Sequence, residues 1–257
     1  MVSLISTTVN LLVFALITIN TADGRAPAKI LEGTDAEPEK FSYMVSLIRG
    51  TVHICGGAYI SPCYVLTAAH CFVGRADPPY TEGLVVVGKA ALNRYSAVMH
   101  EVEKVTPHSG FERGTKSRWR NDIAVVKLKK NITISPYEKP IALPTVDTPS
   151  EIIAILGGWG QTTLRGAETD RLQQMMVHVI SNEECNKRGA DVLPTNLCGF
   201  NGRGQGFCNG DSGGPLVYDG TVVGIVSFSI VCGIGYPDTY TRVYSYIDFI
   251  NKTMNEL

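Results

Sequence analysis

Residues 210–215 read Gly-Asp-Ser-Gly-Gly-Pro, and this hexapeptide carries the strongest signal in the chain. The glycines around Ser212 allow the backbone to turn sharply, so that the serine hydroxyl is exposed and backbone N–H groups are free. Such N–H groups can stabilise an oxyanion, and an exposed serine can act as a nucleophile where a base lies beside it. The hexapeptide therefore predicts a nucleophilic serine. A glycine-rich turn without chemistry is the competing interpretation, and the full six-residue string disfavours it.

Two further strings offer the groups that such a serine needs. Residues 66–71 read Leu-Thr-Ala-Ala-His-Cys, and a disulfide at Cys71 would anchor the imidazole of His70. Residues 121–128 begin Asn-Asp-Ile-Ala, so that Asp122 opens an apolar strand. A carboxylate buried with its strand requires a partner, and histidine is a natural one. The remaining histidines fit ordinary surface or core positions: His53, His100, His108 and His178.

Length, composition and charge indicate an all-β protein. The chain has 257 residues, of which 44% are hydrophobic and 26 are glycine. Short β-like runs alternate with turn residues from position 30 onward, which is typical of a sandwich or a barrel. The formal net charge is −1 and no basic run occurs, so nucleic-acid binding is not expected.

The local pattern predicts several strands and two helices. The expected strands are residues 43–48, 84–87, 123–128, 152–156, 177–180, 215–217 and 222–227. A C-terminal helix is expected over residues 244–254, where apolar residues recur at helical spacing. A second, short helix should begin near Ser181, because Ser181 and Glu184 have the spacing of a capping box.

The first 22 residues are predicted to be a secretory signal peptide. Residues 9–19 are almost wholly apolar, too few to span a bilayer comfortably, and small and polar residues follow as far as Ala22. A buried hydrophobic strand is the alternative interpretation. No second long apolar run follows, so a membrane anchor is not expected. The predicted location is secreted and extracellular, where disulfides form readily.

The three strings together resemble the chymotrypsin-like, or trypsin-like, family of serine proteases. They are residues 67–71, 121–124 and 210–215, and they occur in the family's order of histidine, aspartate and serine. Supporting landmarks are residues 55–57, 158–160 and 240–243. The resemblance extends from Ile30 to the C-terminus. It implies an all-β fold of two six-stranded antiparallel β-barrels and a C-terminal helix, with the active site in the cleft between the barrels.

The resemblance also implies a role for each motif residue. Ser212 would attack the peptide carbonyl and form an acyl-enzyme, His70 would transfer the proton, and Asp122 would orient His70. The N–H groups of Gly210 and Ser212 would form the oxyanion hole. The implied activity is that of a secreted serine endopeptidase acting on proteins or peptides, with no cofactor and no metal. Lys89 stands where the family's calcium site would require a carboxylate.

Two other functions compete with this one. The chain could be a catalytically silent homologue that acts as a binding protein, or an extracellular domain with accidental motifs. The usual sign of a silent homologue is the loss of serine, histidine or aspartate, and all three are present.

The resemblance further implies activation by proteolysis. Residues 30–33, Ile-Leu-Glu-Gly, are similar to the family's mature N-terminus. Cleavage after Lys29 would free the amino group of Ile30, which would pair with Asp211 and order the oxyanion hole and the S1 pocket. The implied divisions are a signal peptide over residues 1–22, an activation propeptide over 23–29 and a protease domain over 30–257. The expected partners are substrates, an activating protease and protein inhibitors, and the expected state is a monomer.

Six of the seven cysteines match family positions. The implied disulfides are Cys55–Cys71, Cys185–Cys198 and Cys208–Cys232. Cys63 is left over, and a free thiol is expected there in preference to an intermolecular bridge. Two sequons, at Asn131 and Asn251, offer glycosylation sites whose use the sequence leaves open.

Specificity is where the resemblance leaves alternatives open. Gly206 stands where trypsins have aspartate at the pocket floor, while Asp238 replaces a pocket glycine on the other wall. An ionised Asp238 would favour Arg or Lys at P1, the residue before the cleaved bond, whereas a carboxylate turned away would favour aromatic or large aliphatic residues. The other implied S1 residues are Phe207, Ser227, Phe228 and Ser229. Such a pocket resembles that of the broad collagenolytic proteases of crustaceans and insects, so a broad preference is expected.

Overall fold

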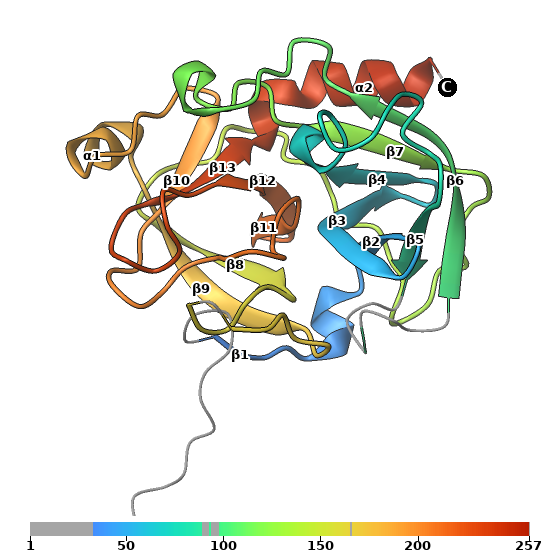
Figure 1. Ribbon diagram of the computed structural model, residues 1–257, viewed down its shortest axis with the longest axis horizontal. Coiled ribbons are helices and arrows are strands. Elements are labelled where there is room, and N and C mark those ends of the chain that lie inside the picture. Colours follow the sequence, from blue (N-terminus) through green and yellow to red (C-terminus); the bar gives the residue numbers. More distant parts are fainter. Residues whose placement is uncertain (1–32, 89–92, 94–97, 165, 257) are drawn as a thin grey trace, which may run out of the picture.

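The computed structural model describes residues 33–88, 93, 98–164 and 166–256. The predicted signal peptide and propeptide, together with Ile30 and Lys89, lie outside these described residues. Two β-barrels lie side by side, and the C-terminal helix runs along one end of the first barrel (Figure 1).

The first barrel closes from six antiparallel strands in the order β2-β3-β4-β7-β6-β5, with β5 paired back onto β2. The strands are β2 (Met44–Arg49), β3 (Val52–Ser61), β4 (Tyr64–Thr67), β5 (Leu84–Gly88), β6 (Val98–Pro107) and β7 (Ala124–Leu128). Apolar side chains alternate inward along these strands, as the two-residue period of a strand requires. Among them, Val45, Leu66 and Val125 are fully buried.

The second barrel also closes from six antiparallel strands, because β11 pairs with β8 at one end of the sheet and β8 pairs with β9. The strands are β8 (Ile152–Gly158), β9 (Gln173–Ile180), β10 (Asn196–Gly199), β11 (Pro215–Tyr218), β12 (Thr221–Phe228) and β13 (Asp238–Arg242). A two-residue strand, β1 (Thr34–Asp35), adds to β9. The predicted architecture of two six-stranded barrels is therefore confirmed.

Both predicted helices are present. Helix α1 (Asn182–Lys187) begins where Ser181 Oγ accepts a hydrogen bond of 3.1 Å from the Glu184 N–H, as the capping box predicted. Helix α2 (Ile247–Asn255) follows a 3-10 turn over Val243–Tyr246, so the α-helix begins slightly later than expected.

Helix α2 follows the second barrel in the chain but packs on the first. The Tyr64 hydroxyl of β4 donates to the Met254 carbonyl at 3.0 Å, and the ring of Phe249 lies 4.8 Å from that of His108. The C-terminus therefore ties the two barrels together.

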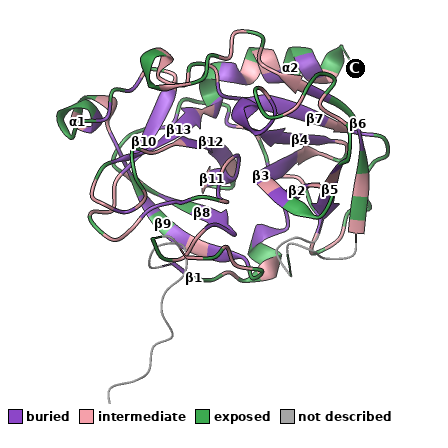
Figure 2. Cartoon of the chain, in the orientation of Figure 1, coloured by how far each residue is buried: buried purple, intermediate pink, exposed green. Residues whose placement is uncertain are grey.

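Buried side chains fill both barrels and the space where they meet (Figure 2). Three disulfides join Cys55 to Cys71, Cys185 to Cys198 and Cys208 to Cys232, which are the pairs that the family resemblance implied. Cys63 is a free, half-buried thiol. No helix within the described part of the chain combines the length and the apolar character needed to cross a membrane.

Candidate active site

His70 and Asp122 meet as a buried pair at the edge of the first barrel. His70 lies in a 3-10 turn (Ala69–Cys71) that the Cys55–Cys71 disulfide anchors, and Asp122 lies two residues before β7. The imidazole Nδ1 is 2.7 Å from Asp122 Oδ2, and the His70 backbone N–H donates to Oδ1 at 2.9 Å. Because an ionised carboxylate can only accept hydrogen bonds, Nδ1 carries the hydrogen and Nε2 of the neutral ring is left to accept a proton.

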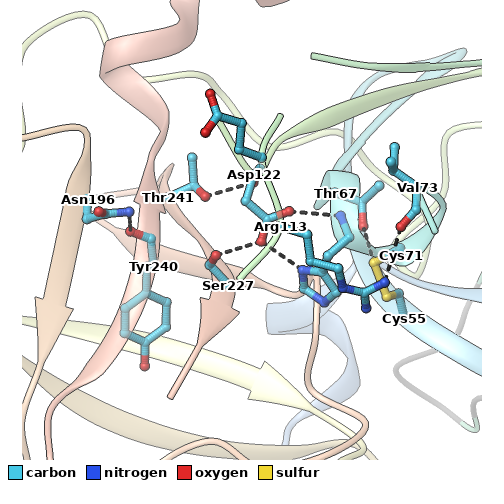
Figure 3. Close-up of polar contacts among 12 residues, drawn as sticks. Cys55, Thr67, Cys71, Val73, Arg113, Asp122, Asn196, Ser227, Tyr240 and Thr241 are labelled. Atoms are coloured by element: carbon cyan, nitrogen blue, oxygen red, sulfur yellow. Dashed lines mark hydrogen bonds and ion pairs between the residues drawn. A yellow bond between two sulfur atoms is a disulfide. The ribbon is translucent and has the colours of Figure 1, made fainter. Parts of the chain in front are cut away.

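The second barrel holds the Asp122 carboxylate in place. The Ser227 hydroxyl of β12 donates to Oδ2 at 2.6 Å, and the Thr241 hydroxyl of β13 donates to the Asp122 backbone carbonyl at 2.7 Å (Figure 3). Asp122 is fully buried. The carboxylate is therefore fixed by donors from both barrels, as a buried charge requires.

Replacing Ser227 by alanine is expected to lower kcat/KM for peptide hydrolysis by about tenfold, because a hydrogen bond to a buried charge is lost. Steady-state kinetics on one peptide substrate measure the effect. Ser150→Ala is the matched control, since Ser150 is exposed and lies outside the cavity that Ser227 lines. A Ser227→Ala enzyme in which only KM changes would show that Ser227 acts solely as a wall of the substrate cavity.

Ser212 and His70 line one cavity between the barrels, with a volume of about 190 Å³. Four of the six predicted S1 residues line the same cavity: Phe207, Ser227, Phe228 and Ser229. The structure thus brings the predicted nucleophile, the predicted base and most of the predicted pocket together. Gly206 and Asp238 are not among the residues that line it.

Gly210 adopts a backbone conformation that only glycine tolerates well. Its φ is +97°, and a Cβ there would lie 2.9 Å from the Gly160 Cα. The Gly210 carbonyl lies 2.9 Å from His53 Nε2, and His53 Nδ1 lies 2.7 Å from the Ser46 hydroxyl. Because a carbonyl only accepts, Nε2 of His53 carries the hydrogen. These contacts hold the backbone of the residue predicted to supply an oxyanion-hole N–H.

This role of His53 goes beyond the ordinary surface or core position predicted for it from the sequence. His53 is buried, yet its ring connects the first barrel to the loop that carries Ser212. The one available signal was its spacing, since His53 and Cys55 are two residues apart on a strand and share a face. That spacing alone does not indicate what the ring contacts.

Asp211 is almost wholly buried beside the predicted nucleophile. It is 1% exposed, and its two oxygens accept hydrogen bonds from the backbone N–H groups of Gly160 and Cys208 at 2.8 and 2.9 Å. Burial raises the pKa of Asp211 to about 7, despite these two bonds, and the nearby carboxylate of Glu168 raises it further. Among the described residues, no cation pairs with Asp211.

Asp238 occupies the space that a side chain at position 206 would fill. A Cβ on Gly206 would lie 2.5 Å from Asp238 Oδ2, and the same oxygen accepts a hydrogen bond of 2.9 Å from the Phe207 N–H. The side chain is 7% exposed, and burial raises the pKa of its carboxyl to about 8. Phe207, by contrast, lines the cavity and packs edge-on against Tyr240, with ring centroids 5.4 Å apart.

Trp119 also lines the cavity, and no sequence motif predicted it. Its ring stands edge-on to the His70 ring at a centroid distance of 5.8 Å. It also stacks on Phe228 at 6.0 Å with an interplanar angle of 17°. Trp119 therefore joins the histidine of one barrel to the pocket wall of the other. It lies in an irregular segment after the αL residue Arg118, where no periodicity marks a functional side chain.

One group of potential metal ligands occurs within the described residues: Cys55, His70 and Cys71, whose ligand atoms lie within 4.8 Å of one another. Cys55 and Cys71 form a disulfide and offer no thiolate. His70 would have to leave Asp122 to bind a metal through Nδ1. This group therefore lacks the donors of a metal site.

The chain is similar to known serine proteases over most of its length. The family model described as Trypsin matches residues 30–250, so the chain is a serine endopeptidase by class. Chymotrypsin-2 of Vespa crabro is 37% identical, over 87% of this chain and 99% of the relative. Brachyurin of Leptuca pugilator is 33% identical, over 86% and 96%. Trypsin I-P1 of Gallus gallus is 34% identical, over 88% and 90%. The chain belongs to the trypsin family.

Proposed function

We propose that the chain is secreted as an inactive precursor and that cleavage after Lys29 yields an endopeptidase whose catalytic residues are His70, Asp122 and Ser212. The observation that carries the proposal is the buried pair of His70 Nδ1 and Asp122 beside a cavity that Ser212 also lines. This arrangement leaves Nε2 of His70 as the base for the serine hydroxyl.

The reaction follows from these positions. Ser212 Oγ attacks the peptide carbonyl while Nε2 of His70 accepts the hydroxyl proton, and Asp122 stabilises the imidazolium that forms. The C–N bond then breaks, His70 passes the proton to the leaving amine, and the acyl group stays on Ser212. Water, deprotonated by His70, attacks the acyl-enzyme and releases the acid. The backbone N–H groups of Gly210 and Ser212 are proposed to stabilise the oxyanion in both halves of the reaction.

The proposed activation rests on the environment of Asp211. A buried carboxylate without a cation is costly, and burial raises the pKa of Asp211 accordingly. The ammonium freed at Ile30 is the proposed partner, since Lys29 and Ile30 stand at a boundary similar to the family's activation site. The proposed secretion rests on the apolar run at residues 9–19 and on the three disulfides.

For specificity, we propose that the S1 pocket prefers apolar P1 residues at neutral pH. The rings of Phe207 and Phe228 and the Cys208–Cys232 disulfide supply apolar walls to the cavity. Asp238 does not line the cavity, and its raised pKa leaves its carboxyl largely neutral at pH 7.

Cleavage after arginine, relative to leucine, is expected to rise as the pH increases through about 8. Asp238 is neutral below its pKa and charged above it, so a negative charge near the pocket base develops only on the alkaline side. Matched Arg and Leu peptides, assayed between pH 6 and about 9.5, give the ratio of kcat/KM. Asp238→Asn should make the ratio independent of pH. A wild-type ratio that already favours arginine at pH 6 would contradict the proposed pocket.

Active-site labelling tests the proposed function directly. The protein is cut after Lys29 and treated with a fluorophosphonate, which reacts with activated serines. We expect labelling at Ser212, identified by peptide mass spectrometry, together with cleavage of internal bonds in an unfolded protein substrate. Labelling that persists in a His70→Ala variant would contradict the proposed role of His70. No labelling in the cleaved protein would contradict the proposal as a whole and support a silent homologue.

A further inference from the structure

Two arginines line the cavity that holds His70 and Ser212. Arg75 follows the turn that carries His70, and Arg113 lies in the segment between β6 and β7. Arg75 and Arg113 are both exposed. Within the described part of the chain, neither forms an ion pair with a carboxylate, although Asp77 and Glu112 lie nearby in the sequence.

The neighbouring arginines behave differently. Arg118 pairs with Asp191 at 2.9 Å, and Arg120 lies 3.9 Å from Glu112. Asp191 and Glu112 are thus paired with arginines that do not line the cavity. No aspartate or glutamate is among the residues that line it, so the cavity wall carries two positive charges and no negative one.

Arg113 is held in place without a counter-ion. Its guanidinium lies over the Trp119 ring at 5.6 Å from the centroid, and Nη1 donates to the Val73 carbonyl at 3.3 Å (Figure 3). The same Trp119 ring stands edge-on to His70. Arg113 is therefore one ring away from the catalytic histidine, and its orientation is fixed before any ligand binds.

The two guanidinium groups also interact electrostatically. Partial burial lowers the pKa of Arg75, the positive charge of Arg113 lowers it further, and the buried charge of Asp122 offsets part of this effect. Two like charges beside one cavity repel, and an anion placed between them would relieve the repulsion. The planar guanidinium group binds a carboxylate through two parallel hydrogen bonds.

We propose that Arg75 and Arg113 form an anion subsite, which selects substrates with an aspartate or glutamate close to the cleaved bond. The proposal rests on the proposed endopeptidase function and adds a substrate class to it. The apolar S1 pocket would take the P1 residue, and the arginine pair would take an acidic residue next to it in the peptide.

Peptide pairs that differ only as Asp against Asn test the subsite. The P1 residue is leucine in every peptide. The Asp or Asn residue is placed in turn at each of the two positions before P1 and at each of the two positions after it. At one position, we expect kcat/KM for the Asp peptide to exceed that for the Asn peptide by about three- to tenfold at low ionic strength. The preference should shrink as salt is added, because both arginines are solvent-exposed.

Variants then assign the preference to the two arginines. Arg75→Gln and Arg113→Gln should each bring the Asp/Asn ratio toward one, while Arg113→Lys should keep part of it. Arg171→Gln is the matched control, because Arg171 is exposed and does not line the cavity, and it should keep the full ratio. Since the ratio is taken within one variant, a general loss of activity does not affect it. If Arg113→Gln does not fold, Arg75→Gln decides.

Each outcome has a definite meaning. A wild-type ratio near one at every position, or a ratio that survives both glutamine variants, overturns the subsite and leaves the endopeptidase intact. If the cleaved protein hydrolyses no peptide at all, the proposed function fails instead. In that case, the same peptides are given a fluorescent label, and fluorescence anisotropy compares the affinities of the Asp and Asn peptides for the protein. Tighter binding of the Asp peptide that is lost in Arg75→Gln supports the subsite, and equal binding overturns it.

Discussion

Replacing Ser212 by alanine will lower kcat for peptide hydrolysis by about 10⁴- to 10⁶-fold, because no other hydroxyl can take its place against His70. Two other serines line the cavity. Ser227 donates its hydroxyl to Asp122, and Ser229 follows Phe228 in the pocket wall. The activity that remains will come from binding and from the backbone N–H groups alone.

Three measurements check this expectation. They are kcat on a leucine peptide, the extent of fluorophosphonate labelling and the Tm, which should change little because Ser212 is not a core residue. Ser150→Ala is the matched control, since Ser150 is exposed and lies outside the cavity. Loss of activity with a large fall in Tm would indicate a misfolded protein, whereas retained activity would show that another residue is the nucleophile.

Cleavage after Lys29 will raise kcat/KM by at least about 100- to 1000-fold, the usual cost of a missing oxyanion-hole donor. The reason lies in Asp211, whose buried carboxyl directly precedes Ser212 and shares a tight turn with Gly210. The new ammonium at Ile30 will pair with this carboxyl and fix the turn. The assay compares intact and cleaved protein, with N-terminal sequencing to verify that the new chain begins at Ile30.

Two variants separate this mechanism from simple removal of a propeptide. The wild type and both variants are treated with one lysine-specific protease. Lys29→Gln should stay inactive after this treatment, and Asp211→Asn should be cut at Lys29 without gaining activity. An intact Lys29→Gln protein as active as the cleaved wild type would contradict activation at this bond.

The Asp211 carboxyl should also make the stability of the uncleaved protein depend on pH. The pKa of Asp211 is 3.8 in the reference state and about 7 in the folded chain, so the folded chain binds the proton more tightly. Its stability should therefore fall as the pH rises from about 4 to about 7. Cleavage after Lys29 should remove this loss, because the ammonium stabilises the charged carboxylate.

Much of the fold could be predicted from local patterns, but several strands could not. Strand β6 (Val98–Pro107) has charged residues on its outer face, which weaken its apparent hydrophobicity. Strand β3 (Val52–Ser61) contains Gly56 and Gly57, which propensity alone disfavours in a strand. Strand β13 (Asp238–Arg242) is polar and yet almost wholly buried, and its Asp238, Thr241 and Arg242 side chains form hydrogen bonds to other segments. Each of these strands owes its conformation to barrel closure.

Some residues of the site could likewise be predicted from the sequence, and others could not. Short motifs were sufficient to predict His70, Asp122 and Ser212, because the chemistry requires particular residue types in a particular local backbone. His53, Trp119 and the arginine pair lie in the site through tertiary contacts between segments far apart in the chain. Asp238 illustrates the limit: its residue type indicated a charged pocket, whereas its burial beside Gly206 and its absence from the cavity wall do not.

Strand β13 and helix α2, near the C-terminus, complete the contacts between the two barrels. Thr241 of β13 donates to Asp122, and helix α2 returns from the second barrel to the Tyr64 side of the first. These segments follow all three residues in the chain, so a nascent chain carries His70, Asp122 and Ser212 for some time without the contacts that hold them together. The order of translation therefore delays assembly of the site, independently of the proposed activation at Lys29.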